Sequence, residues 1–213
     1  MKVFLTGLGT AAAAAPTSGF LDRLYARKAL KVMDARTLTA LPAALTAFDQ
    51  SGCHSAPERL AISLAVGPCD FAAAEISRAL ASGPALTPAA RLQKNLHPLW
   101  LLRVLPNMPA SHLAIQFHAR GPCHTTFDAA QALRQAIDWM VTDEADSVLC
   151  GAADDSSAVL LVLESGNSIC HQKVLAELDQ NFHLPATPAP GVVSPLAAWV
   201  SKLTAVRRCL NLK

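Results

Sequence analysis

The amino-acid sequence predicts an α/β protein in which helices cover both faces of a mixed sheet. Short and almost purely apolar runs, such as residues 60–66, alternate with longer segments of helical periodicity. Hydrophobic residues make up 52% of the 213 residues and charged residues only 16%, which excludes a disordered chain and a coiled coil. A chain of this length can remove about 70% of its unfolded surface from water, so a large core is possible.

The chain opens with a predicted strand and a predicted long helix. Residues 3–5 form a short apolar run, and Gly7 and Gly9 behind it indicate a tight turn. A secretory signal is the alternative for this start, but glycines and threonines interrupt its apolar stretch. Apolar residues then recur at helical spacing from about Ala35 to Gln50, and Gly52 provides a stop signal.

The middle of the chain is predicted to alternate between a strand, two helices and a loop. Residues 60–66 form a buried strand that ends before Gly67, and an Ala-rich helix runs from Asp70 to about Ser82. Glycine and prolines make residues 83–98 mostly loop. A helix follows from about Pro109 to Arg120, and its small residues allow a neighbour to approach closely.

The last part of the chain contains three predicted strands and two predicted helices. The strands cover residues 123–127, 147–150 and 158–163, and a helix covers residues 129–141. We divide the chain into an α/β domain over residues 1–184 and a proline-rich linker with a C-terminal helix over residues 185–213. Whether this last helix packs on the domain or on a partner stays open.

Composition and motifs exclude several classes of function. The net charge is +2 and no basic run occurs, so we expect no nucleic-acid binding. No apolar stretch is long enough to span a bilayer. The six cysteines form no CxxC pair, which predicts reduced thiols and a cytoplasmic protein. The histidines show no metal-ligand spacing, and Gly7-Leu8-Gly9 lacks the rest of a nucleotide motif, so we expect neither metal nor cofactor.

The segment 101–140 carries a specific resemblance. It contains in order, and without gaps, Asn107-Met108, Ala110-Ser111-His112, Gly121-Pro122 and His124-Thr125. This order resembles that of β-ketoacyl synthases of the thiolase fold, in which a strand then leads to a catalytic cysteine at a helix start. The similarity extends to residues 6–9, 27–52 and 145–163. It implies the N-terminal half of a thiolase-like fold.

The resemblance also implies that the catalytic nucleophile is missing. Counting from Gly121 without a gap puts the cysteine position at Ala130. Cys123 lies in the preceding strand, away from the helix start whose dipole would lower its pKa. The family's two active-site histidines belong to a C-terminal half that this sequence does not contain. We therefore expect that this chain alone catalyses no condensation.

Asp128 and Gln131 occupy the N-cap and N3 positions of the predicted helix 129–141, an Asp analogue of a capping box. In that phase Ala130, Leu133, Ile137 and Met140 lie on the buried face. A one-residue slip would instead put Gln131 at the cysteine position, where chain-length factors related to the synthases often carry glutamine. We prefer the capping role, because the ungapped match needs no slip.

The resemblance implies a non-catalytic chain-length factor, in the short form associated with type II polyketide systems such as those that make aryl polyenes. Such a subunit forms a heterodimer with an active β-ketoacyl-ACP synthase, and the acyl carrier protein reaches it through that complex. By ungapped match, Trp100 falls where condensing enzymes place a gating aromatic residue. The alternative for Trp100 is an ordinary interface or core tryptophan. Phe71, Met108 and Phe127 are further candidates for the acyl tunnel or the interface, and for Phe71 we favour core packing.

Three other interpretations remain. A malonyl-ACP decarboxylase could use Gln131, although it would lack the histidines that bind a thioester carbonyl. A hydrolase could use Cys123 and His124, although adjacent residues of a strand point to opposite faces. The third interpretation is a homodimeric remnant of a synthase that has lost its function.

Overall fold

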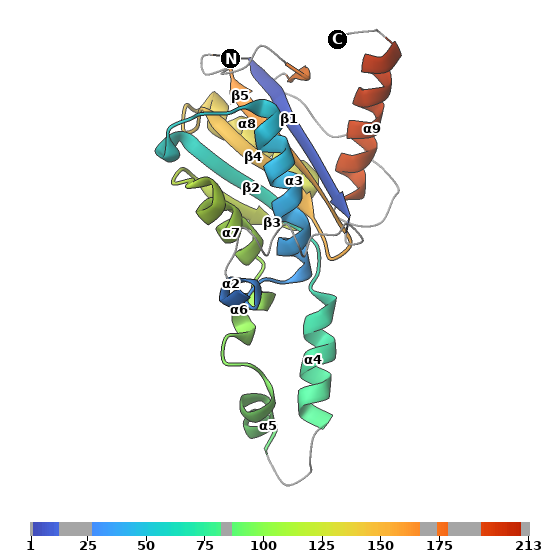
Figure 1. Cartoon of the computed structure of the whole chain (residues 1–213). Coiled ribbons are helices and arrows are strands. Elements are labelled where there is room, and N and C mark those ends of the chain that lie inside the picture. Colours follow the sequence, from blue (N-terminus) through green and yellow to red (C-terminus); the bar gives the residue numbers. More distant parts are fainter. Residues whose placement is uncertain (1, 13–26, 82–86, 167–173, 179–192, 210–213) are drawn as a thin grey trace.

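The computed structural model describes residues 2–12, 27–81, 87–166, 174–178 and 193–209. They form a six-stranded sheet of order β3-β2-β4-β5-β1-β6 (Figure 1). The strands are β1 (Val3–Ala12), β2 (Leu60–Val66), β3 (Cys123–Thr126), β4 (Ser147–Ala153), β5 (Ser157–Ser165) and β6 (Ala176–Leu178). Strand β2 runs parallel to β3 and β4, whereas the pairs β4–β5, β5–β1 and β1–β6 are antiparallel. The sheet is mixed, as predicted.

Helices cover both faces of this sheet. They are α2 (Arg27–Leu30), α3 (Ala35–Ser51), α4 (Asp70–Ala81), α5 (Pro88–Asn95), α6 (Trp100–Val104), α7 (Met108–Phe117), α8 (Ala129–Val141) and α9 (Ser194–Cys209), with a 3-10 turn η1 (Pro57–Arg59). Helices α3 and α7 pack on one face, and α8 and the first turns of α9 pack on the other. Helices α4 and α5 project away from the sheet (Figure 1).

The two glycines near the N-terminus lie inside β1, so the predicted tight turn is wrong. A Cβ atom at Gly9 would lie 1.8 Å from the carbonyl oxygen of Ala43, and one at Gly7 would lie 2.0 Å from that of Ala47. Both alanines are fully buried in α3. Glycine is therefore required because the helix backbone approaches the strand closely, which is a long-range packing effect that local sequence rules read as a turn.

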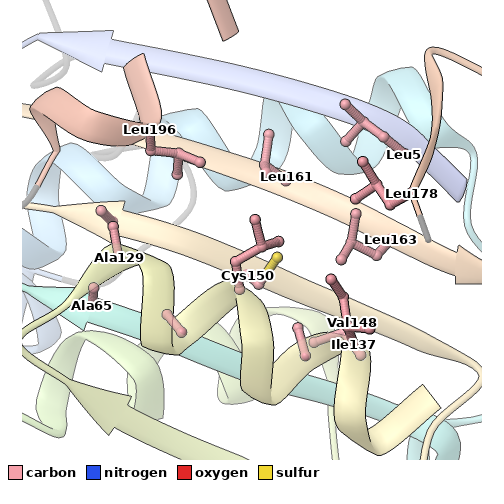
Figure 2. Packing of buried hydrophobic residues seen from close by; sticks show 14 of the residues in the cluster. Leu5, Ala65, Ala129, Ile137, Val148, Cys150, Leu161, Leu163, Leu178 and Leu196 are labelled. Atoms are coloured by element: carbon pink, nitrogen blue, oxygen red, sulfur yellow. The ribbon is translucent and has the colours of Figure 1, made fainter. Parts of the chain in front are cut away.

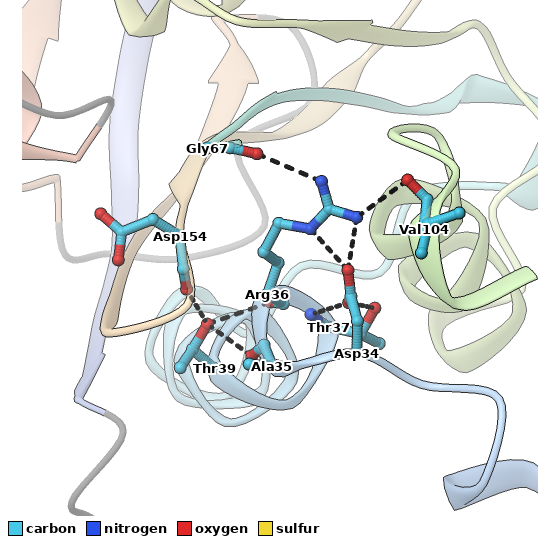
Figure 3. A network of polar contacts seen from close by, with 8 residues as sticks. All are labelled: Asp34, Ala35, Arg36, Thr37, Thr39, Gly67, Val104 and Asp154. Atoms are coloured by element: carbon cyan, nitrogen blue, oxygen red, sulfur yellow. Dashed lines mark hydrogen bonds and ion pairs between the residues drawn. The ribbon is translucent and has the colours of Figure 1, made fainter. Parts of the chain in front are cut away.

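The start of α3 contains a buried ion pair (Figure 3). Asp34 caps the helix by accepting a hydrogen bond from the backbone N–H of Thr37 at 2.9 Å. Its other carboxylate oxygen pairs with Arg36, whose side chain is almost completely buried. The guanidinium also donates to the carbonyl oxygens of Gly67, at 3.1 Å, and of Val104, at 3.4 Å. A buried charge needs such partners, and here they join α3, the turn after β2 and the end of α6.

The C-terminal helix belongs to the core of the described structure. Figure 2 shows Leu196 of α9 and Ile137 of α8 in one layer with strand residues such as Leu161. Trp199 and Val200 are buried in the same cluster. The sequence left open whether this helix packs on the domain or on a partner, and in the described structure its first turns pack on the domain.

The segment predicted as mostly loop, residues 83–98, contains the whole of α5 and is followed shortly by α6. The Oγ1 atom of Thr87 accepts a hydrogen bond from the N–H of Ala90, and Pro88 occupies the first helical position. This cap and proline are a standard helix start, so the sequence did contain the signal for α5. No helix within the described ranges combines the length and the apolar character needed to cross a membrane.

Candidate functional site

The start of α8 follows directly from β3 and holds the position that the sequence assigns to a lost nucleophile. The Oδ1 atom of Asp128 accepts a hydrogen bond from the N–H of Ala130 at 2.8 Å, so Asp128 is an N-cap, as predicted. Ala130 itself is partly exposed, whereas Ala129 and Leu133 are buried. The predicted burial is confirmed for Leu133, Ile137 and Met140 and wrong for Ala130. The buried face includes Ala129, Ala132 and Ala136 instead, which leaves Ala130 at its margin.

Gln131 makes a different contact from the one predicted for it. Its Oε1 atom accepts a hydrogen bond from the hydroxyl of Thr126, and the same hydroxyl accepts from the N–H of Asp128 at 3.3 Å. Thr126 therefore takes over the role that a capping box gives to the N3 side chain. Sequence reasoning missed Thr126, although a threonine two residues before an N-cap aspartate is typical of a hydroxyl-stabilised turn.

The chemistry available at this junction is limited by its side chains. The Asp128 carboxylate, the Thr126 hydroxyl and the Gln131 amide hydrogen-bond to the helix start or to one another. The methyl group of Ala130 can neither attack a thioester nor move a proton. Among the described residues, no group of three or more histidine, cysteine or acidic side chains is arranged to hold a metal ion.

Cys123 and His124 are neighbours on β3 and do not form a nucleophile–base pair. The His124 ring meets Trp139 of α8 edge to face, with ring centroids 6.4 Å apart. The side chain of Cys123 points to the opposite face of the strand. Desolvation raises the pKa of the Cys123 thiol, which favours the unreactive protonated form.

Strand β3 lies at one edge of the sheet, and two exposed apolar residues belong to the segments next to it. It pairs with β2 alone among the described strands. Phe127, directly after the strand, is 66% exposed, and Ile115 of the adjacent helix α7 is 67% exposed. We call β3 with Phe127 and Ile115 the β3 edge. Met108, at the start of α7, is partly buried.

Trp100 contributes to a second region, away from the β3–α8 junction in the fold. Its indole N–H donates to Oε2 of Glu75 on α4, and Oε1 of Glu75 lies 3.7 Å from an Nη atom of Arg103. Trp100 lines a cavity of about 450 Å³ between α4, the end of α5 and α6. Phe71 lies in the first turn of α4, and its side chain falls outside the described part. Trp100 and Ala130 therefore belong to different regions.

No family model and no curated protein matches this sequence, but solved structures do. One is a type II polyketide synthase acyl-carrier protein in complex with its ketosynthase bound to the hexaketide. Its TM-score is 0.66 at 16% identity, covering 84% of this chain and 67% of that chain. The fold is ketosynthase-like. The ishigamide ketosynthase/chain length factor has a TM-score of 0.63 at 18% identity, covering 83% of this chain and 62% of that chain.

A β-ketoacyl synthase from Burkholderia phymatum extends this result, with a TM-score of 0.59 at 12% identity. The match covers 83% of this chain and 62% of the synthase chain. The described chain thus matches about two thirds or less of each neighbour. The predicted thiolase-like α/β fold is confirmed.

Proposed function

We propose that this protein is a non-catalytic chain-length factor. It forms a heterodimer with an active β-ketoacyl-ACP synthase and shapes the acyl tunnel of that enzyme, in type II polyketide synthesis of the aryl polyene kind. The observation that carries the proposal is a ketosynthase-like fold with Ala130 at the position that the sequence resemblance gives to the catalytic cysteine.

The local electrostatics at Ala130 support a site without a nucleophile. The positive end of a helix dipole lowers the pKa of a cysteine at the helix start and so stabilises its thiolate. In α8 the carboxylate of Asp128 takes that place, bonded to the N–H of Ala130. The Asp128 carboxylate neutralises the positive end of the helix dipole, and this supports a structural role for the junction.

The β3 edge is the surface that we assign to the ketosynthase partner. No described strand pairs with its outer side, where backbone N–H and C=O groups can pair with a strand of the partner. Phe127 and Ile115 add exposed apolar area beside it, and aromatic residues are enriched in the buried centres of interfaces. Paired strands flanked by apolar contacts are a suitable core for a permanent interface.

Trp100 is the residue that we assign to the end of the partner's acyl tunnel. Its indole is fixed at the N–H by Glu75, and Glu75 is in turn close to Arg103. A ring held in this way has little freedom to move aside. A growing acyl chain that meets it would stop, because packed side chains tolerate little added volume.

The proposal is tested by comparing the purified chain, a full-length ketosynthase from the same genome, and their mixture, with malonyl-ACP as substrate. We expect no condensation and no decarboxylation by the chain alone, and condensation only when the ketosynthase is present. Decarboxylation by the chain alone that is lost in Gln131→Ala and kept in Gln135→Ala would contradict the proposal. That result would establish the decarboxylase alternative.

A further inference from the structure

The cavity between α4, α5 and α6 is a ligand-sized space that the proposed roles of β3 and α8 leave unexplained. Its volume of about 450 Å³ lies within the range of small-molecule sites. One part of its wall is apolar, with Leu96 and the indole of Trp100. The other part is polar, with Arg78, His97 and Arg103.

The charges on this wall favour an anion. Arg78 and Arg103 are permanently cationic, and Glu75 is the only carboxylate among the described residues that line the cavity. Glu75 already accepts the Trp100 indole N–H and lies near Arg103. Arg78 makes no ion pair with any residue of the described chain. Glu75 lies close to Arg103, so Arg78 is the guanidinium on this wall that a ligand can pair with.

His97 adds a hydrogen-bond donor to the same wall. Its Nδ1 atom accepts a hydrogen bond from the backbone N–H of Leu99 at 3.1 Å. In the neutral imidazole the proton is therefore on Nε2, which can donate to a ligand. The lining of the cavity thus includes a guanidinium group, an imidazole donor and apolar side chains.

We propose that this cavity binds a small monocarboxylate with a short apolar body. The carboxylate pairs with Arg78 and accepts from His97, because a planar guanidinium matches a carboxylate in two-point geometry. The apolar body lies against Trp100 and Leu96. A carboxylate monoanion matches the single charge of Arg78, and its apolar body matches Leu96 and Trp100, which inorganic phosphate has no group to contact. The site is formed by this chain alone and does not depend on the proposed ketosynthase partner.

The test is isothermal titration of the purified full chain with hexanoate, with 1-hexanol as the neutral analogue and inorganic phosphate as the second anion. We expect saturable binding of hexanoate, at least about tenfold weaker binding of 1-hexanol, and no saturation with phosphate, because charge-assisted hydrogen bonds carry the affinity. Equal binding of hexanoate and hexanol, or tighter binding of phosphate, would overturn the proposal.

Variants locate the site. Arg78→Gln should weaken hexanoate binding about tenfold. Its fold should be unaffected, because Arg78 is an exposed residue on α4. Arg78→Lys keeps the positive charge but loses the two-point geometry of the guanidinium. Its affinity for hexanoate should lie between those of the wild type and Arg78→Gln. Arg134→Gln, at an exposed position of α8, is the matched control and should bind as the wild type does. Hexanoate binding that is the same in Arg78→Gln and Arg134→Gln, or no binding to the wild type, would refute the site.

Discussion

The hydrogen bond between Trp100 and Glu75 links one side chain to the proposed control of product length. Trp100→Ala removes the indole and opens space beside the cavity. In the complex with the ketosynthase, we expect products that are longer by one or more two-carbon cycles. Acylation of the partner's cysteine should keep a similar rate. The measurement is mass spectrometry of the products.

Trp100→Phe is the control, because it keeps an aromatic ring, although a smaller one, and loses the N–H donated to Glu75. Its product lengths should stay close to those of the wild type. An unchanged product distribution in a normally assembled Trp100→Ala complex would assign the indole to ordinary packing. Phe71 would then be the next residue to substitute.

His112 predicts a pH dependence of stability. Burial in α7 lowers the pKa of His112 below its usual value of about 6.5, and the charge of Asp34 offsets this only in part. With a pKa lower in the folded state than in the unfolded state, the unfolded chain binds the proton more tightly. The free energy of unfolding is therefore unaffected by this group above about pH 6.5 and falls as the pH is lowered through the folded-state pKa.

Urea unfolding at pH 7.5 and pH 5 measures this effect. His112→Leu should lose less stability than the wild type between these two pH values. His54→Gln removes an exposed histidine and should behave as the wild type does. An equal loss of stability in His112→Leu and the wild type would show that other groups control the acid response.

At the scale of elements, the contact between β1 and α3 depends on the absence of a side chain at Gly9. Alanine there would place a Cβ atom 1.8 Å from a backbone oxygen of α3, and neither backbone can yield without moving the element. We expect Gly9→Ala to lower the free energy of unfolding by about 3 kcal/mol, at the upper end for overpacked cores. Gly166→Ala is the control, because its Cβ would approach no atom closer than 3.3 Å. Similar urea midpoints for the two variants would disprove this close approach.

The cap of α8 makes a smaller contribution. Asp128→Ala removes the acceptor for the N–H of Ala130 and should lower the free energy of unfolding by about 1 kcal/mol. Asp128→Asn keeps a good N-cap side chain and should lose much less. If both variants are as stable as the wild type in urea unfolding, the Thr126 hydroxyl alone holds this helix start.

Elements with local signals were predictable, and those that depend on distant partners were not. The sequence located β2 and α8 because an apolar run and an N-cap aspartate are visible within a few residues. It misread Gly7 and Gly9, because the reason for them is the backbone of α3. In the same way, burial of Arg36 depends on carbonyl groups of Gly67 and Val104, far along the chain.

The candidate site shows the same division. Asp128 was identified as a cap because its signal is local, whereas the hydroxyl of Thr126 was overlooked as the partner of Gln131. The cavity at Trp100 could not be predicted, since it exists only through the mutual placement of α4, α5 and α6. The sequence predicts residues 83–98 as mostly loop, so it gives no reason to expect a cavity wall there.

At the scale of the whole molecule, the two edges and two faces of the sheet are used differently. Helices α3 and α7 bury one face, and α8 with α9 buries the other. On the outer side of α8 the exposed residues include Gln131, Arg134 and Asp138, which are polar. The two most exposed large apolar residues of the described structure, Phe127 and Ile115, lie at the β3 edge, whereas Leu99, Leu101 and Leu105 lie on or beside α6 and Val141 ends α8. We expect the partner at the β3 edge, because there exposed apolar side chains accompany an edge strand.

The central claim is that this chain is one half of a permanent heterodimer, and the most direct test is its co-expression with a full-length ketosynthase from the same genome. Size-exclusion chromatography with light scattering should give a 1:1 complex, with an interface above about 2,000 Å² as in permanent assemblies. Alone, the chain should aggregate or self-associate. Phe127→Asp at the β3 edge should abolish the complex, whereas Val141→Asp, at an exposed apolar position of α8, should leave it intact. A monodisperse monomer that does not bind the ketosynthase would contradict the account.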